Sequence, residues 1–210
     1  MIIDLYTEEL LKLAEAARVS LEGMETGHVN LLRSEWTKLF VSRMHAHTFY
    51  NDQMKGFANK RVRASLDHAM VETIAMQLKA YLRKIGRLDM VVHSEKSIPG
   101  SRCRPDVSVW IGERCVAAIE CKVQLGWDRD NHEQNFTNRE AALTAAGVPV
   151  GNVWHVVASQ CNWVRGTTPR WGSRWLVVGE EYSGHWKPFG VGCTVIHPID
   201  PMYVEIGQLA

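Results

Sequence analysis

The chain has 210 residues, of which 46% are hydrophobic and 22% are charged, and its formal net charge is +1. These ordinary values for a folded domain exclude extensive disorder and a simple polycationic nucleic-acid binder. No run approaches the roughly 18 apolar residues of a membrane-spanning helix. The acidic N-terminus lacks the features of a signal peptide, and none of the five cysteines forms a CxxC pair. We therefore expect a cytoplasmic protein with reduced thiols and no zinc site.

Charge is distributed unevenly along the chain. Residues 1–30 carry two basic and six acidic side chains, a net of −4, whereas residues 55–104 carry eleven basic and four acidic ones, a net of +7. A basic segment of this kind indicates contact with a polyanion such as nucleic acid. A solvated helix surface would have the same composition, so this feature alone does not decide between the two.

Helical periodicity dominates the first part of the chain. Apolar residues at three- and four-residue spacing predict helices over residues 5–21 and 29–46. A third helix is expected over residues 65–85, with Ser65 as its N-cap and Gly86 as its C-terminal signal. The polar, basic stretch between the second and third helices divides the chain. We therefore expect an N-terminal helical appendage, residues 1–60, and a core, residues 61–210.

The remainder of the chain is rich in β-forming residues. Strands are predicted over residues 90–93, 106–111, 114–123 and 152–158, with a helix over residues 129–146 before the last of these. Two further runs, residues 175–178 and 192–196, indicate a C-terminal β extension. The order from residue 65 is α-β-β-β-α-β, and the helical crossover allows the third and fourth strands to be parallel. We expect an α/β fold with a mixed sheet and helices on its faces.

A group of polar residues stands where two of these strands begin and end. Pro105-Asp106 opens one strand, and Glu120-Cys121-Lys122 closes the next. Because side chains alternate along a strand, Glu120 and Lys122 share one face while the Cys121 side chain points to the other. Charged side chains that come directly after the apolar run Val116-Ala117-Ala118-Ile119 are costly in a central strand unless they serve a purpose.

Asp106 joins Glu120 on that face only in a particular register. A two-residue turn with no bulge would put Asp106 on the opposite face, whereas a three-residue loop or a bulge would place it opposite Glu120, with Cβ atoms about 5 Å apart. Two carboxylates that close repel each other unless a cation lies between them, and Mg²⁺ prefers oxygen ligands. Such a site suits phosphodiester hydrolysis, with Lys122 positioning the attacking water and the backbone carbonyl of Cys121 as a further ligand.

Pro-Asp, a strand hairpin and Glu-x-Lys together resemble the PD-(D/E)XK nuclease superfamily, which includes the type II restriction endonucleases. The resemblance covers residues 65–158, and the continuation QLGWDRDNHEQNF also looks like the segment after the lysine in some of these nucleases. It implies a restriction-endonuclease-like core, with Asp106 and Glu120 as metal ligands and Lys122 as the catalytic lysine. It also implies Mg²⁺ as cofactor, for which Mn²⁺ is expected to substitute, and double-stranded DNA as substrate.

The family often adds an acidic ligand from the helix before the first strand. Glu72 matches that location, although it lies opposite the apolar stripe of its helix, which suits plain solvent exposure equally well. Glu35 and Glu95 are rival candidates for the same role.

The segment NWVRGTTPRWGSRW, residues 162–175, contains three tryptophans and three arginines and no acid. Arginines contact phosphates and guanine edges, so Arg165, Arg170 and Arg174 are predicted to contact DNA. The alternative is a β-hairpin whose tryptophans belong to the core.

The most specific expectation is a Mg²⁺-dependent endonuclease of the type II restriction kind, acting as a homodimer on double-stranded DNA. Three alternatives stay open. One is a repair, recombination or phage nuclease that recognises DNA structure rather than sequence. The second is a DNA-binding module on the same fold without catalysis, and the third is an RNA-cutting relative.

Overall fold

The computed structural model describes residues 8, 36–37, 39–41, 43–44, 66–123, 131–159, 174–179 and 197–210. Within these ranges lie all the elements of the predicted α-β-β-β-α-β core. The first predicted helix (apart from residue 8), the strand predicted at 192–196, and the candidates Glu35, Arg165 and Arg170 lie outside the described residues. No helix among the described residues has the length and apolar character needed to cross a membrane.

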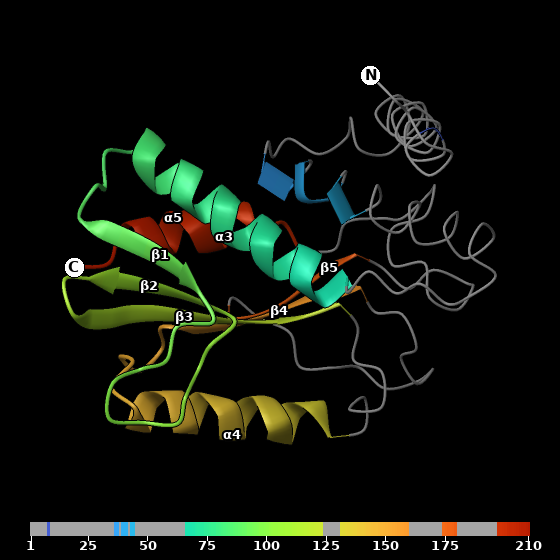
Figure 1. Cartoon of the computed structure of the whole chain (residues 1–210). Helices are drawn as coiled ribbons and strands as arrows, with labels where there is room; N and C mark the ends of the chain where they lie inside the picture. The colour runs from blue at the N-terminus through green and yellow to red at the C-terminus, as the bar shows by residue number, and fades with distance from the viewer. Residues whose placement is uncertain are drawn as a thin grey trace.

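Among the described residues, five strands form one mixed sheet, in the order β1-β2-β3-β4-β5 (Figure 1). The strands are β1 Met90–Ser94, β2 Val107–Ile111, β3 Arg114–Lys122, β4 Val153–Ser159 and β5 Trp175–Gly179. The first three pair in antiparallel fashion, whereas β3, β4 and β5 are parallel. The predicted mixed sheet and the parallel pairing of the third and fourth core strands are therefore confirmed.

Helices cover both faces of this sheet (Figure 1). Helix α3, Leu66–Lys84, and helix α5, Asp200–Gly207, lie on one face, and helix α4, His132–Ala145, lies on the other. Because β3 is covered on both sides, Cys115–Ile119 is buried without interruption, which is typical of a central strand between two helical layers. The order α3-β1-β2-β3-α4-β4 is the predicted α-β-β-β-α-β order.

The hairpin of β2 and β3 combines a two-residue turn with a bulge. Ile111 pairs with Arg114 across the turn, and Gly112 has φ +57°, as the first central position of a type II′ turn requires. The pairing then shifts between Trp110 and Val109, so that Val116 is the extra residue on β3. Beyond this bulge Val107 pairs with Ile119 at the end of the ladder, and the same register continued by one residue sets Asp106 opposite Glu120. The register that the candidate site needs is therefore present, through the bulge rather than a three-residue loop.

The C-terminal part of the chain differs from the predicted β extension. The run at residues 175–178 is a strand, but it belongs to the main sheet as β5, and the last described element is helix α5. The sequence contains the signals for this helix, since Pro201 stands in its first turn and Ile199, Met202, Tyr203 and Ile206 have helical spacing. These apolar residues are buried against α3 and the sheet.

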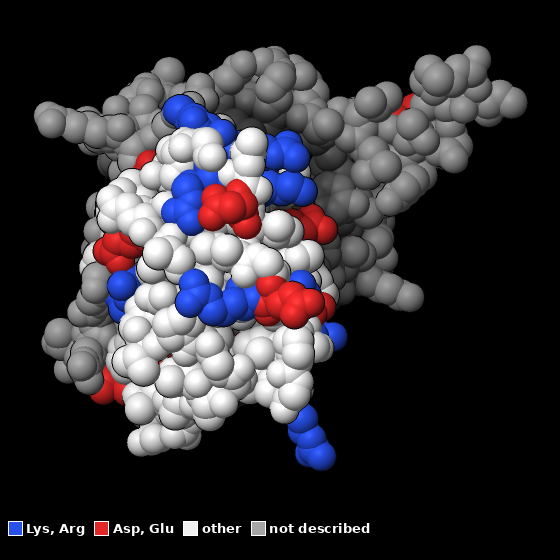
Figure 2. Space-filling model, turned by 90° about the vertical axis from the view of Figure 1, so that its left-hand side faces the viewer, with Lys and Arg blue, Asp and Glu red and all other residues white. Residues whose placement is uncertain are grey.

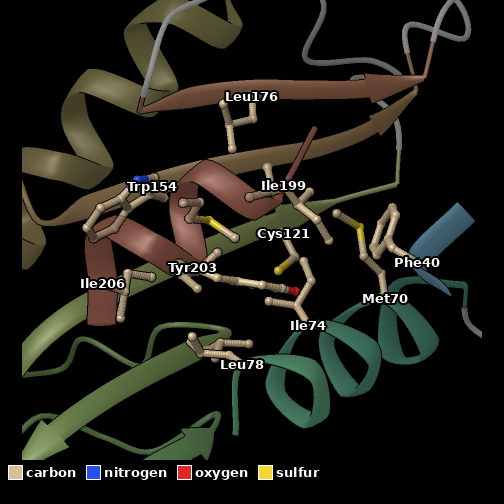
Figure 3. Close-up of a cluster of buried hydrophobic side chains, with 14 of the residues drawn as sticks. Phe40, Met70, Ile74, Leu78, Cys121, Trp154, Leu176, Ile199, Tyr203 and Ile206 are labelled. Atoms are coloured by element: carbon tan, nitrogen blue, oxygen red, sulfur yellow. The ribbon is translucent and has the colours of Figure 1, made fainter. Parts of the chain in front are cut away.

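The main hydrophobic core lies between the sheet and the layer of α3 and α5 (Figure 3). Described helical residues from the predicted N-terminal appendage belong to this core, since Phe40, Val41 and Met44 are buried in it. Polar contacts accompany this packing, because the Thr37 hydroxyl donates a hydrogen bond of 2.6 Å to Asp200 at the start of α5. A smaller cluster, which includes Trp110 and Leu143, fills the space between the sheet and α4.

Candidate active site

The end of β3 directs its side chains to both faces of the sheet. The Cys121 thiol is buried in the core under α3 and α5, near Tyr203 and Ile74 (Figure 3). Glu120 and Lys122 lie on the α4 side, where both line a pocket of about 300 Å³. Side chains at the end of β3 therefore alternate between the two faces of the sheet, as the Glu-x-Lys spacing predicts. The buried Cys121 thiol lies on one face, and the charged groups of Glu120 and Lys122 lie on the other.

Asp106 is fixed to β3 beside Glu120 by a hydrogen bond. The backbone N–H of Cys121 donates to Oδ2 of Asp106 over 2.7 Å. In an antiparallel ladder the N–H and C=O of one residue point to the same neighbouring strand. The Cys121 carbonyl is therefore directed to the β2 side, on which Asp106 also lies.

Both carboxyl groups are held in surroundings that disfavour their charge. Burial raises the pKa of Asp106, against the lowering effects of the Cys121 N–H and the nearby Lys122 and Arg139. Burial likewise raises the pKa of Glu120, and the charge of Asp106 raises it further, whereas the hydrogen bond from Arg139 lowers it. A bound cation would relieve the cost that these two carboxylates share.

Arg139 of α4 supplies a positive charge beside Glu120. Its Nη2 donates to Oε1 of Glu120 over 2.9 Å and to the backbone carbonyl of Arg104 over 2.9 Å. The side chains of Arg139 and Glu120 are 32% and 13% exposed, so the ion pair is partly shielded from water and open to the pocket on one side. Partial burial of this kind strengthens the pair compared with one on an open surface.

The pocket beside Glu120 and Lys122 is closed by residues of α4 and β4. Its other lining residues are His132, Asn135, Phe136, Arg139 and His155. His155 pairs with Glu120 across the parallel ladder of β3 and β4, and its ring stacks on Phe136 with centroids 4.2 Å apart. Nε2 of His155 is buried and has no hydrogen-bond partner among the described residues. The pocket therefore combines two cationic side chains with a wall of three buried rings, those of His132, Phe136 and His155.

Because His155 is buried, we expect the protein to lose stability as the pH falls. Burial, aided by the positive charge of Arg139, lowers the pKa of His155 to about 3, whereas an unfolded histidine titrates near 6.5. Protons therefore bind the unfolded chain first, and the stability present above pH 6.5 is lost as pH falls toward 3. We expect the difference in unfolding free energy between wild type and His155→Gln to narrow by about 1 kcal/mol per pH unit between pH 6 and 4. Urea unfolding at several pH values measures this, and parallel pH profiles for the two proteins would contradict it.

The structure does not bring Glu72 to the carboxylate pair. Glu72 is exposed on α3, across the sheet from α4, where it lines a separate pocket with Ser94. Of the two described candidates, Glu95 is nearer to the carboxylate pair than Glu72, because its backbone N–H donates to the Asp106 carbonyl over 3.0 Å and its charge raises the pKa of Asp106. Its carboxylate lies 3.5 Å from a guanidinium nitrogen of Arg104.

The donor set fits a hard cation held by few protein ligands. Among the described residues no group of three or more His, Cys, Asp or Glu side chains is placed to hold a metal ion. Mg²⁺, however, is commonly held by one or two carboxylates together with water and substrate phosphates. Asp106, Glu120 and the Cys121 carbonyl match that requirement, and the shared charge of the two acids favours it.

Arg174 is engaged within the protein. Its guanidinium lies over the Trp154 ring, 4.1 Å from the ring centroid, and forms an ion pair with Glu205 of α5. These contacts position β5 against α5, and they would have to be exchanged before Arg174 could bind a phosphate. The contact between Arg174 and DNA stays a prediction.

The end of the molecule where β2 turns into β3 carries charges of both signs (Figure 2). Blue and red side chains alternate on this face, and an ion pair of 2.9 Å joins Arg87 to Asp89. Lys122 is at the opposite end of β3 from this turn. The basic composition of residues 55–104 therefore does not produce a purely positive surface at this end.

Arg139 and His155 were not identified from the sequence. A signal for Arg139 exists, because His132, Phe136, Arg139 and Leu143 share one helical stripe and the other three are buried. A cation on such a stripe requires an acidic partner. His155 carries no comparable signal, since its position beside Glu120 depends on the register of two strands that are distant in sequence.

No protein family, curated protein or solved structure matches this chain. Any assignment of function therefore depends on the arrangement of the described residues.

Proposed function

We propose that the protein is a Mg²⁺-dependent endonuclease of the restriction-endonuclease type that hydrolyses phosphodiester bonds in double-stranded DNA. The observation that carries this proposal is the bulge in the β2–β3 hairpin, which brings Asp106 into register with Glu120 on the face that also holds Lys122. Two partly buried acids and an exposed lysine stand at the end of a central strand, beside an apolar core where charged groups are costly unless they serve a purpose.

Asp106, Glu120 and the Cys121 carbonyl would hold the Mg²⁺ ion. When bound there, the ion would polarise a phosphoryl oxygen and lower the pKa of a coordinated water. The Cys121 N–H keeps Asp106 oriented toward this position. The burial of both carboxyl groups strengthens their attraction for a cation, because charges interact more strongly away from bulk water.

Lys122 has the location expected of a group that acts on the reacting phosphate. Its side chain is exposed and lines the pocket, and it stands two residues after the metal ligand Glu120 on the same face of β3. A lysine ammonium placed there positions the attacking water and offsets the negative charge that develops on the phosphorus centre. Because Lys122 belongs to a sheet strand rather than a loop, its backbone is held rigidly.

A panel of substrates tests the proposed substrate class. Purified protein with Mg²⁺ is incubated with linear duplex, nicked and branched DNA, and with RNA of the same length. We expect cleavage of the linear duplex, with Mn²⁺ able to replace Mg²⁺. Exclusive cutting of branched DNA would favour a structure-specific nuclease, and exclusive cutting of RNA would contradict the proposal.

We also propose a homodimer, because cutting both strands of a two-fold symmetric site suits a two-fold symmetric protein. Light scattering after size exclusion, with and without duplex DNA, measures the mass in solution. A monomer under both conditions would contradict this part of the proposal.

A further inference from the structure

We propose that Arg139 is a phosphate-binding residue controlled by the metal site: it neutralises Glu120 in the metal-free protein and is released to bind the DNA phosphate when a divalent cation takes its place. This inference rests on the proposed function and adds a residue that couples the cation to the substrate. The ligand class is a phosphodiester, bound in the pocket between α4 and the end of β3.

The first observation is that Arg139 lies beside the same carboxylates that would bind a cation. Arg139 lies 2.9 Å from Glu120, and its charge also acts on Asp106. Arg139 is therefore the counter-ion of the same two carboxylates that would hold Mg²⁺. A cation bound to Glu120 would supply the positive charge that Arg139 now supplies, and it would remove the attraction that holds the guanidinium there.

The second observation is that Arg139 faces a pocket that a phosphate can enter. Arg139 and Lys122 are the two cations among the seven lining residues, and both are accessible. Both hydrogen bonds of Arg139 use Nη2, and Nε and Nη1 have no partner among the described residues. A planar guanidinium with donors to spare is suited to bidentate recognition of a phosphate. The bond from Nη2 to the Arg104 carbonyl keeps the group at the pocket after Glu120 is released.

Thermodynamic linkage is a consequence of this exchange. If one residue is bound either to Glu120 or to phosphate, then a cation on Glu120 strengthens phosphate binding, and phosphate strengthens cation binding by the same factor. A cation held by Glu120 would also attract phosphate through its own charge, but that contribution does not require Arg139. The part of the coupling that Arg139 carries is therefore separable by substitution.

The experiment measures the affinity of the protein for a duplex oligonucleotide by fluorescence anisotropy, once in EDTA and once in Ca²⁺. Ca²⁺ serves as a probe because it binds oxygen ligands. Gels confirm that the DNA stays intact. We expect Ca²⁺ to raise the DNA affinity of the wild type about tenfold. The same addition should raise the DNA affinity of Arg139→Gln by less than about threefold. Arg83→Gln, an exposed arginine on α3 across the sheet, is the control and should keep the wild-type enhancement.

A second pair of variants tests the same exchange without a metal. Glu120→Gln removes the negative charge that holds Arg139, whereas Asp106→Asn removes one negative charge from the same site and leaves the Arg139–Glu120 ion pair in place. In EDTA we expect Glu120→Gln to bind DNA more tightly than Asp106→Asn, by about threefold or more. That difference should disappear when Arg139→Gln is added to both.

Equal Ca²⁺ enhancement in wild type and Arg139→Gln would overturn this inference. If the wild type also binds Mn²⁺ by calorimetry and cuts DNA, the proposed function survives that result. If the wild type shows neither Ca²⁺ enhancement nor Mn²⁺ binding, the proposed function and this inference fail together. Glu120→Gln and Asp106→Asn binding DNA equally in EDTA would also overturn the exchange.

Discussion

Lys122→Ala should lower the rate of DNA cleavage by at least about 100-fold while leaving the protein folded. Loss of one preorganised group that stabilises developing charge typically costs a factor of about 100 to 1,000. Lys122 is exposed and makes no hydrogen bond to a described residue, so its removal should change the unfolding free energy by less than about 0.5 kcal/mol. The measurement is single-turnover cleavage with protein in excess, which separates the chemical step from DNA affinity.

Lys79→Ala provides the matched control for this variant. Lys79 is an exposed lysine on α3, on the other face of the sheet, so its removal deletes the same charge far from the pocket. We expect wild-type cleavage by Lys79→Ala. Retention of more than about a tenth of the wild-type rate by Lys122→Ala would exclude the role that we assign to the lysine.

Asp106→Asn should weaken binding of Mn²⁺ at least about tenfold and abolish cleavage. Loss of residues that merely support metal ligands costs about 10- to 100-fold in affinity, so loss of a ligand should cost no less. Asparagine can still accept the hydrogen bond from the Cys121 N–H, so the hairpin should keep its register. Isothermal titration with Mn²⁺ gives the affinity and the stoichiometry.

Stability provides an independent signature of Asp106. Its carboxyl pKa is raised by burial, so the ionised group destabilises the metal-free fold at pH values above that pKa. Asp106→Asn should therefore be at least as stable as the wild type at neutral pH, as expected for a residue kept for function. Glu113→Gln, in the exposed β2–β3 turn, is the control and should bind Mn²⁺ like the wild type. Unchanged Mn²⁺ affinity in Asp106→Asn would contradict its assignment as a ligand.

Local periodicity was enough to predict the elements of the core. The apolar run of β3 predicts a covered central strand, and the period of two places Glu120 and Lys122 together. The α-β-β-β-α-β order and the parallel pairing of β3 and β4 could be predicted from the lengths of the connecting segments. For the hairpin, the sequence leaves open whether a longer loop or a bulge restores the register, because nothing in the residue types around Val116 marks it as the extra residue.

The features of the site that could not be predicted from the sequence depend on long-range packing. Arg139 reaches Glu120 because the crossover helix α4 packs on the same face of the sheet, and His155 reaches it through strand register. Glu72 has the position along the chain that was expected of a metal ligand. Helix α3, however, packs on the face of the sheet opposite α4, and Glu72 lines another pocket there. Helix α5 has readable signals, but a strand interpretation of the C-terminal region obscured them.

The most direct test of the proposed function is incubation of the purified protein with long viral duplex DNA of mixed sequence, in Mg²⁺ and in EDTA. The arrangement of Asp106, Glu120 and Lys122 predicts cleavage that requires Mg²⁺ and that is absent for Lys122→Ala. Discrete fragments would show recognition of a sequence, and a smear would show cleavage without it. DNA that stays intact in Mg²⁺ and in Mn²⁺ at stoichiometric protein, or that is cut equally well in EDTA, would contradict the proposal.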